Sequence, residues 1–208
     1  MKHEWKKTEK KFYFPNVIPE KIVVPKFNFY TIEGEGNPND DDFAEHVSVL
    51  FSLSYAIKMG LKSAEVVPKN YTDYAVYPLE GVWDITEEAK RNMNGKLDKN
   101  SLVYKLMIRQ PAFITADFAA ENIELTKKKK PHQLLDHVKF ETIEEGSCVQ
   151  MLHMGSFDNE PQSFKLMEQF AEEKQLKRKS LTHREIYLSD ARKTIPERLR
   201  TILRFQVE

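Results

Sequence analysis

Hydrophobic and polar positions follow two periods along the chain, one typical of strands and one of helices. Between residues 43 and 61, apolar side chains recur every three or four positions, which predicts a helix ending near Gly60. Thr86 and Thr115 precede two further helical stretches and are the residue type that caps helices. The elements predicted in this part are a strand at 21–33, the helix over 43–61, a strand at 74–84, a helix at 86–93, a strand at 101–111 and a helix at 115–125.

A similar order begins again after residue 130. The chain then predicts a strand at 138–154, a helix over about 160–175, a strand at 183–190, a short helix at 194–199 and a strand at 200–207. The sequence therefore predicts an α+β fold of duplicated strand–helix–strand–strand units, related by a pseudo-twofold axis, with a central ligand cleft. Residues 1–20 are expected to form a partly ordered lead-in segment. One domain then spans 21–208, with halves of about 21–130 and 131–208.

The strand HREIYLSD, residues 183–190, contains the strongest candidate for a functional residue. Alternation places Arg184, Ile186 and Leu188 on one face, with Glu185 and Tyr187 on the other. An exposed face would leave Glu185 to pair with a lysine or arginine. An enclosed face would instead give a carboxylate that binds a cation or moves protons. Alternation alone leaves both readings open.

The segment YAVYPLEGVWD, residues 74–84, carries aromatic residues at strand spacing. One face of this strand would carry Tyr77, Leu79 and Trp83. These side chains form either the floor of a pocket for flat lipophilic compounds or part of the core. Glu80 has the opposite parity and is expected in a turn or at the surface, although Gly81 could reverse the parity locally.

Composition and motifs exclude several classes of function. Lysine plus arginine equals aspartate plus glutamate, so a nucleic-acid partner is not expected. No apolar run approaches membrane-spanning length, and the single Cys148, expected in a buried strand, fits a reducing cytoplasm. His132 and His137 do not have the spacing of metal ligands on a helix. Neither a metal nor another cofactor is predicted.

Four segments together resemble a known family. They are YTIEGEGNPN at 30–39, YAVYPLEGVWD at 74–84, LHMGSFDNEP at 152–161 and HREIYLSDARKTIPERLRTILR at 183–204. The chain from about residue 15 is similar to the GyrI-like small-molecule-binding domains. The resemblance implies an aromatic cleft for flat, lipophilic and often cationic compounds. The acidic residue of the penultimate strand falls on Glu185, and the tryptophan after Pro-Leu-Glu-Gly falls on Trp83.

The resemblance also bears on activity. Only about 20 residues precede the first predicted strand, so a helix-turn-helix regulator is not expected. Some stand-alone relatives hydrolyse cyclopropane-containing genotoxins without a cofactor. That activity implies Glu185 as general base, with Tyr187 or an ordered water as proton donor. The ligand-binding candidates are Tyr77, Leu79, Trp83 and Phe113. The alternatives are a non-catalytic drug-sequestering module and an inhibitor of gyrase.

Overall fold

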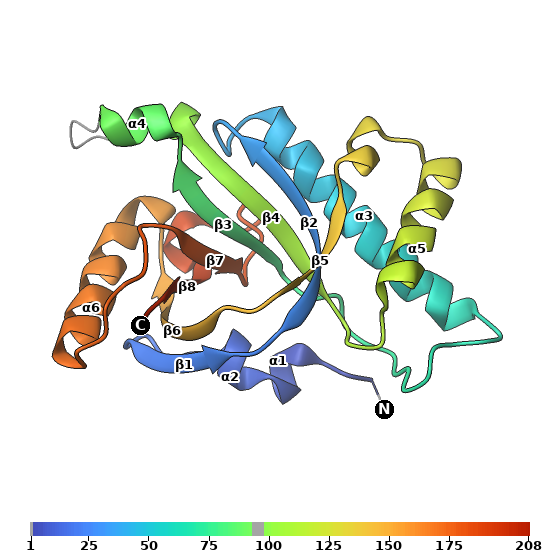
Figure 1. The fold of residues 1–208 in the computed structure, drawn as a ribbon, viewed down its shortest axis with the longest axis horizontal. Helices are drawn as coiled ribbons and strands as arrows, with labels where there is room; N and C mark the ends of the chain where they lie inside the picture. The colour runs from blue at the N-terminus through green and yellow to red at the C-terminus, as the bar shows by residue number, and fades with distance from the viewer. Residues whose placement is uncertain (1, 93–97) are drawn as a thin grey trace. The chain divides into compact units, whose positions relative to one another are not determined.

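The computed structural model describes residues 2–92 and 98–208, and it confirms the predicted α+β class (Figure 1). Within these ranges the chain forms six α-helices and eight strands. The elements are α1 (Trp5–Thr8), α2 (Lys10–Tyr13), β1 (Glu20–Val24), β2 (Phe27–Glu35), α3 (Asp41–Ser63), β3 (Leu79–Ile85), α4 (Glu87–Arg91), β4 (Leu102–Gln110), α5 (Ala116–Lys129), β5 (Lys139–Ile143), β6 (Gly146–Met154), α6 (Glu160–Glu173), β7 (His183–Tyr187) and β8 (Arg200–Gln206).

The repeated order of elements is confirmed. Strand, long helix, strand, strand occurs once as β2–α3–β3–β4 and once as β6–α6–β7–β8. A short helix separates the last two strands of each set, α4 in the first and the 3₁₀ helix η4 (Pro196–Arg198) in the second. Thr86 caps α4 and Thr115 caps α5, each through its side-chain oxygen, as the sequence predicts. Residue 93, at the end of the predicted helix 86–93, lies outside the described residues.

The chain divides into two compact units. Unit 1 comprises Met1–His3, Phe27–Leu79 and Trp83–Ile143, and unit 2 comprises Glu4–Lys26, Glu80–Val82 and Glu144–Glu208. Each unit is described by itself below.

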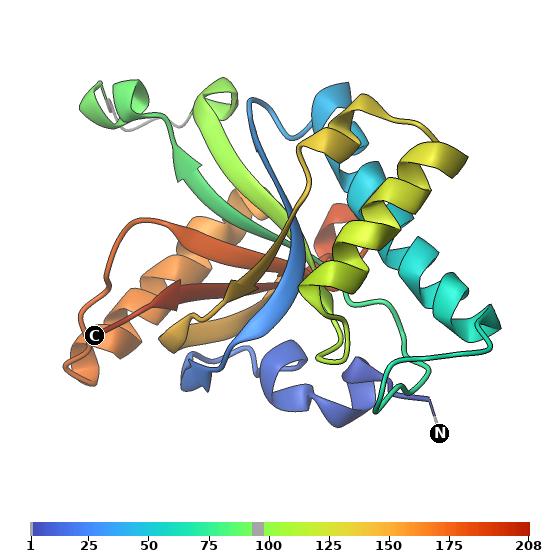
Figure 2. The same ribbon diagram turned by 45° about the vertical axis from the view of Figure 1, so that its right-hand side comes forward.

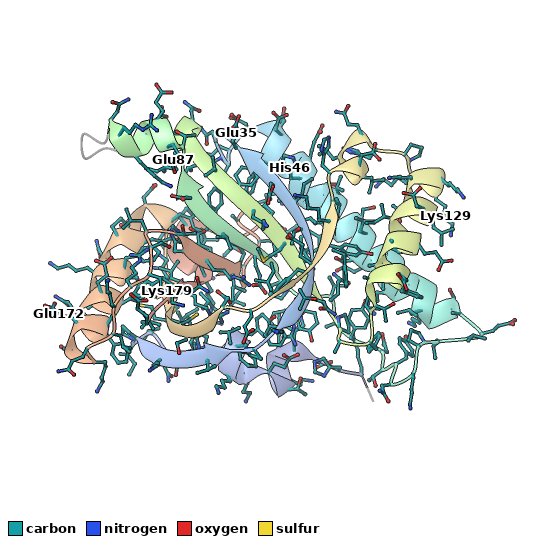
Figure 3. All side chains as sticks on the ribbon, in the orientation of Figure 1. Glu35, His46, Glu87, Lys129, Glu172 and Lys179 are labelled. Atoms are coloured by element: carbon teal, nitrogen blue, oxygen red, sulfur yellow. The ribbon has the colours of Figure 1, made fainter. Side chains whose placement is uncertain are left out.

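In unit 1, helices α3 and α5 cover one face of the antiparallel strands β5, β2 and β4 (Figure 2). Tyr30 is fully buried there and donates a hydrogen bond to the carbonyl of Ala119 at 3.0 Å. Asn122 donates to both the Tyr30 hydroxyl and the carbonyl of Leu53, each at 3.3 Å. These bonds link β2, α3 and α5 through polar groups that would otherwise be buried without partners. Lys129, in contrast, is exposed near the end of α5 (Figure 3).

In unit 2, the antiparallel strands β1, β6, β8 and β7 lie in that order, and α6 packs on one face. Phe164 and Phe170 of α6 pack against this core. Glu172 lies on the exposed side of the same helix (Figure 3). The buried core residues under α6 are Val149, Met151, Met167, Ala171, Leu203, Phe205 and Val207.

Several predicted boundaries are wrong, and one of them is the start of β3, which lies at Leu79 rather than at residue 74. The predicted strand at 21–33 is two strands, because Pro25 between them lacks the N–H that a ladder needs. The strand predicted at 138–154 is also two, and β6 begins at Gly146, whose φ of 69° is left-handed. Gly60 lies inside α3 rather than at its end, since the helix continues to Ser63.

The opposite face of the unit 2 sheet carries a buried ion network. Glu80 is only 2% exposed, so its predicted place in a turn or at the surface is wrong. Arg184 donates to Glu80 at 2.8 Å and lies 3.1 Å from Glu145. Arg204 donates to the other oxygen of Glu145 at 2.8 Å. Burial acts to raise the pKa of Glu145, but the two arginine charges outweigh it and lower the pKa.

The network also contacts the segment before β1, which the sequence predicts to be a partly ordered lead-in. Arg204 donates to the carbonyl of Phe12 at 3.0 Å, and the Tyr13 hydroxyl donates to Glu80 at 3.4 Å. Trp5 packs against Tyr13 with ring centroids 5.1 Å apart, and both side chains are buried. The short helices α1 and α2 therefore belong to the core of unit 2.

Replacing Arg184 tests this network. We expect Arg184→Met to lower the free energy of unfolding by about 3–5 kcal/mol, because Glu80 loses its arginine and Glu145 keeps only one. Urea denaturation of the purified protein measures the change. The matched control is Arg192→Met, since Arg192 pairs with Asp190 while 77% exposed, and its effect should stay below about 0.5 kcal/mol. Equal effects of the two substitutions would contradict a structural role for the network.

Candidate functional site

Glu185 lies on the face of the unit 2 sheet that α6 covers. The register pairs Glu185 of β7 with Leu203 of β8, and Leu203 with Met151 of β6. Directly opposed residues in antiparallel strands share a face, so all three side chains point the same way. Leu203 and Met151 belong to the core under α6. The carboxylate thus continues a row of apolar side chains.

The carboxylate of Glu185 is enclosed rather than wet. The residue is 8% exposed, so the exposed-face reading of HREIYLSD is wrong. Nε2 of His183, also on β7, lies 3.1 Å from Oε1 of Glu185. Because a carboxylate only accepts hydrogen bonds, the ring N–H donates. The His183 ring packs edge-on against Phe164 of α6 at 4.7 Å.

A second carboxyl, on Glu160, lies beside Glu185. Glu160 is the first residue of α6 and is 7% exposed. Burial, the charge of Glu185 and a hydrogen bond to Glu185 raise the pKa of Glu160 far above its usual range, with a smaller effect from Asp158. A raised pKa favours the protonated form of a carboxyl. Two carboxyls with one proton between them are a common arrangement at sites that move protons.

Tyr187 lies in the next row of the same face. It pairs with Thr201 of β8, which in turn opposes His153 of β6. The Tyr187 ring is half-buried and meets the Phe157 ring edge-on at 6.1 Å. Nδ1 of His153 lies 2.8 Å from the Ser163 hydroxyl of α6. Glu185 and Tyr187 therefore share a face, as the alternation predicts.

Unit 1 holds an aromatic cluster around Trp83. The Trp83 ring stacks on Phe43 at 5.8 Å and lies 5.4 Å from the Tyr104 ring. Nδ1 of His46 on α3 lies 3.1 Å from the Tyr104 hydroxyl (Figure 3 labels His46). Burial lowers the pKa of His46 and raises that of Tyr104 to about 12, so both are neutral at physiological pH. Trp83 and Tyr104 are both buried, and the Tyr104 ring is tilted by 55° from the indole, so the cluster is part of the packed core of unit 1.

Comparison with known proteins identifies the family. The model of the GyrI-like small molecule binding domain matches residues 19–208. The chain belongs to this family. A structure titled as a hydrolase from Listeria innocua is 37% identical, with a TM-score of 0.88 over 99% of this chain and 100% of that one. Another hydrolase structure from the same organism is 38% identical, with a TM-score of 0.89 over 100% of both chains.

A more distant structure shares the fold alone. The EcmrR C-terminal domain is 12% identical, with a TM-score of 0.50 over 91% of this chain and 96% of that one. No curated protein sequence matches the chain. Among the helices of the described ranges, none is both long and apolar enough to cross a membrane.

The other aromatic residues that the sequence proposes for this GyrI-like domain have different partners from Trp83. Tyr77 precedes β3, and its ring lies 4.6 Å from the guanidinium of Arg109. Phe113 is half-buried and packs edge-on against Tyr71 and Tyr74. The parity argument does not apply to Tyr77, which is outside the strand. Leu79 begins β3 and is half-buried.

Other sequence expectations concern metals and cysteine chemistry. In residues 2–92 and 98–208, no three histidine, cysteine or acidic side chains gather as metal ligands. Cys148 is fully buried in β6, as predicted, and burial raises the pKa of its thiol to about 12. A thiol with that pKa is a poor nucleophile at neutral pH.

Two residues that interact with Glu185, His183 and Glu160, were not proposed from the sequence. His183 has the same parity as Glu185, two positions away, so the alternation itself could have marked it. Glu160 gives no such signal, because an acidic residue in the first turn of a helix is ordinary. Only the packing of α6 on β7 brings the two carboxyls together.

Gly34 allows the Tyr104 ring to reach the aromatic cluster. The two residues are opposite each other in the β2–β4 pair, and a Cβ built on Gly34 would lie 2.6 Å from Cε2 of Tyr104. We expect Gly34→Ala to displace the ring, alter Trp83 fluorescence and cost about 1–3 kcal/mol of stability. Fluorescence-monitored urea unfolding in a Trp5→Phe background measures both effects, since Trp5 and Trp83 are the two tryptophans.

Gly60→Ala is the matched control. A Cβ at Gly60 meets nothing within 4 Å, and alanine favours the helix by about 1 kcal/mol. This substitution should leave the fluorescence of Trp83 unchanged and preserve or raise stability. An unchanged spectrum and midpoint in Gly34→Ala would contradict the steric role of Gly34.

Proposed function

We propose that this protein binds flat lipophilic compounds, cationic ones included, and hydrolyses those that contain a strained cyclopropane. The buried carboxylate of Glu185, held by His183 and adjoining a second carboxyl, carries the proposal. Two relatives at 37% and 38% identity that are described as hydrolases support it. The single, buried Cys148 is consistent with action in the cytoplasm.

The reaction needs only water and protein side chains. In a cyclopropane conjugated to a dienone, ring strain and conjugation make the ring carbon electrophilic. Glu185 takes a proton from water while the water oxygen bonds to that carbon. The ring C–C bond breaks, and its electron pair moves through the dienone to the carbonyl oxygen. Tyr187 then gives that oxygen a proton, and the proton on Glu185 returns to Tyr187 through solvent.

The aromatic side chains would bind the ligand. Trp83 is 6% exposed and packs against Phe43 and Tyr104, and a planar compound that displaces part of this packing and stacks on the indole would be held in one orientation. Tyr77, Leu79 and Phe113 are further binding candidates, and of these Phe113 and Leu79 are half-buried. No cofactor takes part in the proposed reaction.

The second candidate function is binding without catalysis. The description of the family as a small-molecule-binding domain favours it. In that case Glu185 would serve as a counter-charge for cationic ligands, and the protein would sequester compounds without changing them. Ligand binding would then stabilise the fold without forming product.

A turnover experiment separates the two functions. Excess spirocyclopropyl dienone is mixed with the wild-type protein, and mass spectrometry follows the addition of water. We expect more than one product per protein molecule, and a rate at least about a hundredfold lower in Glu185→Gln, which lacks the base. Glu172→Gln, on the exposed side of α6, is the matched control and should keep the wild-type rate. Intact compound that copurifies with the protein, without product, would support binding alone.

Stacking on Trp83 has its own test. In a Trp5→Phe background, we expect the Trp83 emission to be quenched as a planar ligand saturates the protein. The reason is that the ligand would contact the indole ring directly. Fluorescence titration measures the change, and calorimetry on the same samples measures binding independently. Binding by calorimetry with unchanged emission would show that Trp83 does not contact the ligand.

A further inference from the structure

The start of α6 leaves a buried oxygen without a hydrogen-bond donor. Oε1 of Glu160 is inaccessible to solvent, and within the described ranges no donor reaches it. The charged groups that act on Glu160 are Glu185 and Asp158, both acidic. A buried carboxylate with one oxygen that no donor reaches and with negative neighbours is unfavourable. A proton on Glu160 removes its charge and supplies a donor between the two carboxyls.

Among the described residues, the arginine and histidine side chains of β6 and β7 have partners other than Glu160. Arg184, next to Glu185 on β7, engages Glu80 and Glu145 of the ion network. His153 on β6 directs one ring nitrogen to Ser163 and the other to the carbonyl of Ser156, at 2.8 and 3.0 Å. His183 on β7 hydrogen-bonds to Glu185. The carboxylate of Glu185 is therefore the acceptor for a hydrogen bond that a protonated Glu160 would donate.

We infer that Glu160 is a positioning residue that holds a proton and donates it in a hydrogen bond to the Glu185 carboxylate. This inference rests on the proposed role of Glu185 and deepens it. Glu185 then accepts from two fixed donors, His183 and Glu160, so its orientation is set before a ligand arrives. The two carboxyls together carry one negative charge.

Two substitutions of Glu160 distinguish the effect of its hydrogen bond from the effect of its side-chain size. Glu160→Gln keeps the shape and an N–H donor, so we expect turnover within a few-fold of the wild type. Glu160→Ala removes the donor, and kcat should fall roughly ten- to a hundredfold with KM little changed, the equivalent of one hydrogen bond to a charged group. Equal losses of kcat in both variants would overturn the inference, as would wild-type kcat in Glu160→Ala. Circular dichroism confirms that each variant is folded.

Infrared spectroscopy tests the proton without any substrate. At neutral pH in heavy water, we expect the wild-type protein to show the C=O stretching band of a protonated carboxyl. The band should be absent in Glu160→Gln and present in Glu185→Gln, because burial alone disfavours ionisation of Glu160. A wild-type protein without the band, or a band lost in Glu185→Gln alone, would overturn the inference. A protein that shows the band but no turnover would refute the proposed hydrolysis and leave the proton on Glu160.

The stability of the protein should also depend on this proton. Glu160 binds a proton more tightly in the folded state than in the unfolded state, where the pKa is about 4.3. The stabilisation is thus complete below that value and is lost as the pH rises toward the folded pKa. From about pH 5 to about pH 9, the urea midpoint of the wild type should fall relative to that of Glu160→Gln. A constant difference between the two midpoints would contradict the protonation of Glu160.

Discussion

The ion pairs of Arg184 are the constraint on which the site in unit 2 depends. Arg184 and Glu185 are adjacent on β7 and are both buried, so each must face a different environment. The bonds from Arg184 to Glu80 and Glu145 fix which face the arginine takes. A register slip of one residue would put a guanidinium under α6 and a third carboxylate into the ion network. The network on one side of the sheet thereby places Glu185 on the other.

The same network resolves a conflict inside the sheet. Arg184 and Arg204 are directly opposite each other in the β7–β8 pair, where like charges repel. Glu145 lies between them and binds one arginine with each oxygen. Removing these charges from water has a large cost, so the network is a poor source of net stability. Its effect is on specificity, since only one register satisfies every charge and also binds the carbonyl of Phe12 from the N-terminal segment.

The sequence predicts the local features of this structure well and the long-range ones poorly. Helix caps at Thr86 and Thr115 and the repeated order of elements depend on short-range patterns, and they are confirmed. The environment of Glu80 depends on Arg184, far away in the chain, and its predicted exposure is wrong. The parity of a strand tells which residues share a face but not whether that face is buried. Strand parity therefore allowed Glu185 to be proposed from the sequence. Glu160, its neighbour in space, lies on a helix and gave no such signal.

The contrast between the two faces of the unit 2 sheet is the strongest physical argument for where its chemistry lies. On the network face, two glutamates meet two arginines, and every charge has a partner of opposite sign. On the α6 face, Glu160 and Glu185 meet each other beside an apolar core, and a histidine donates to Glu185. Folding alone would favour apolar residues at both positions, as at Leu203 and Met151 in the same row. Local violations of the packing rules are typical of functional sites, and this pair is such a violation in a unit that balances its other buried charges.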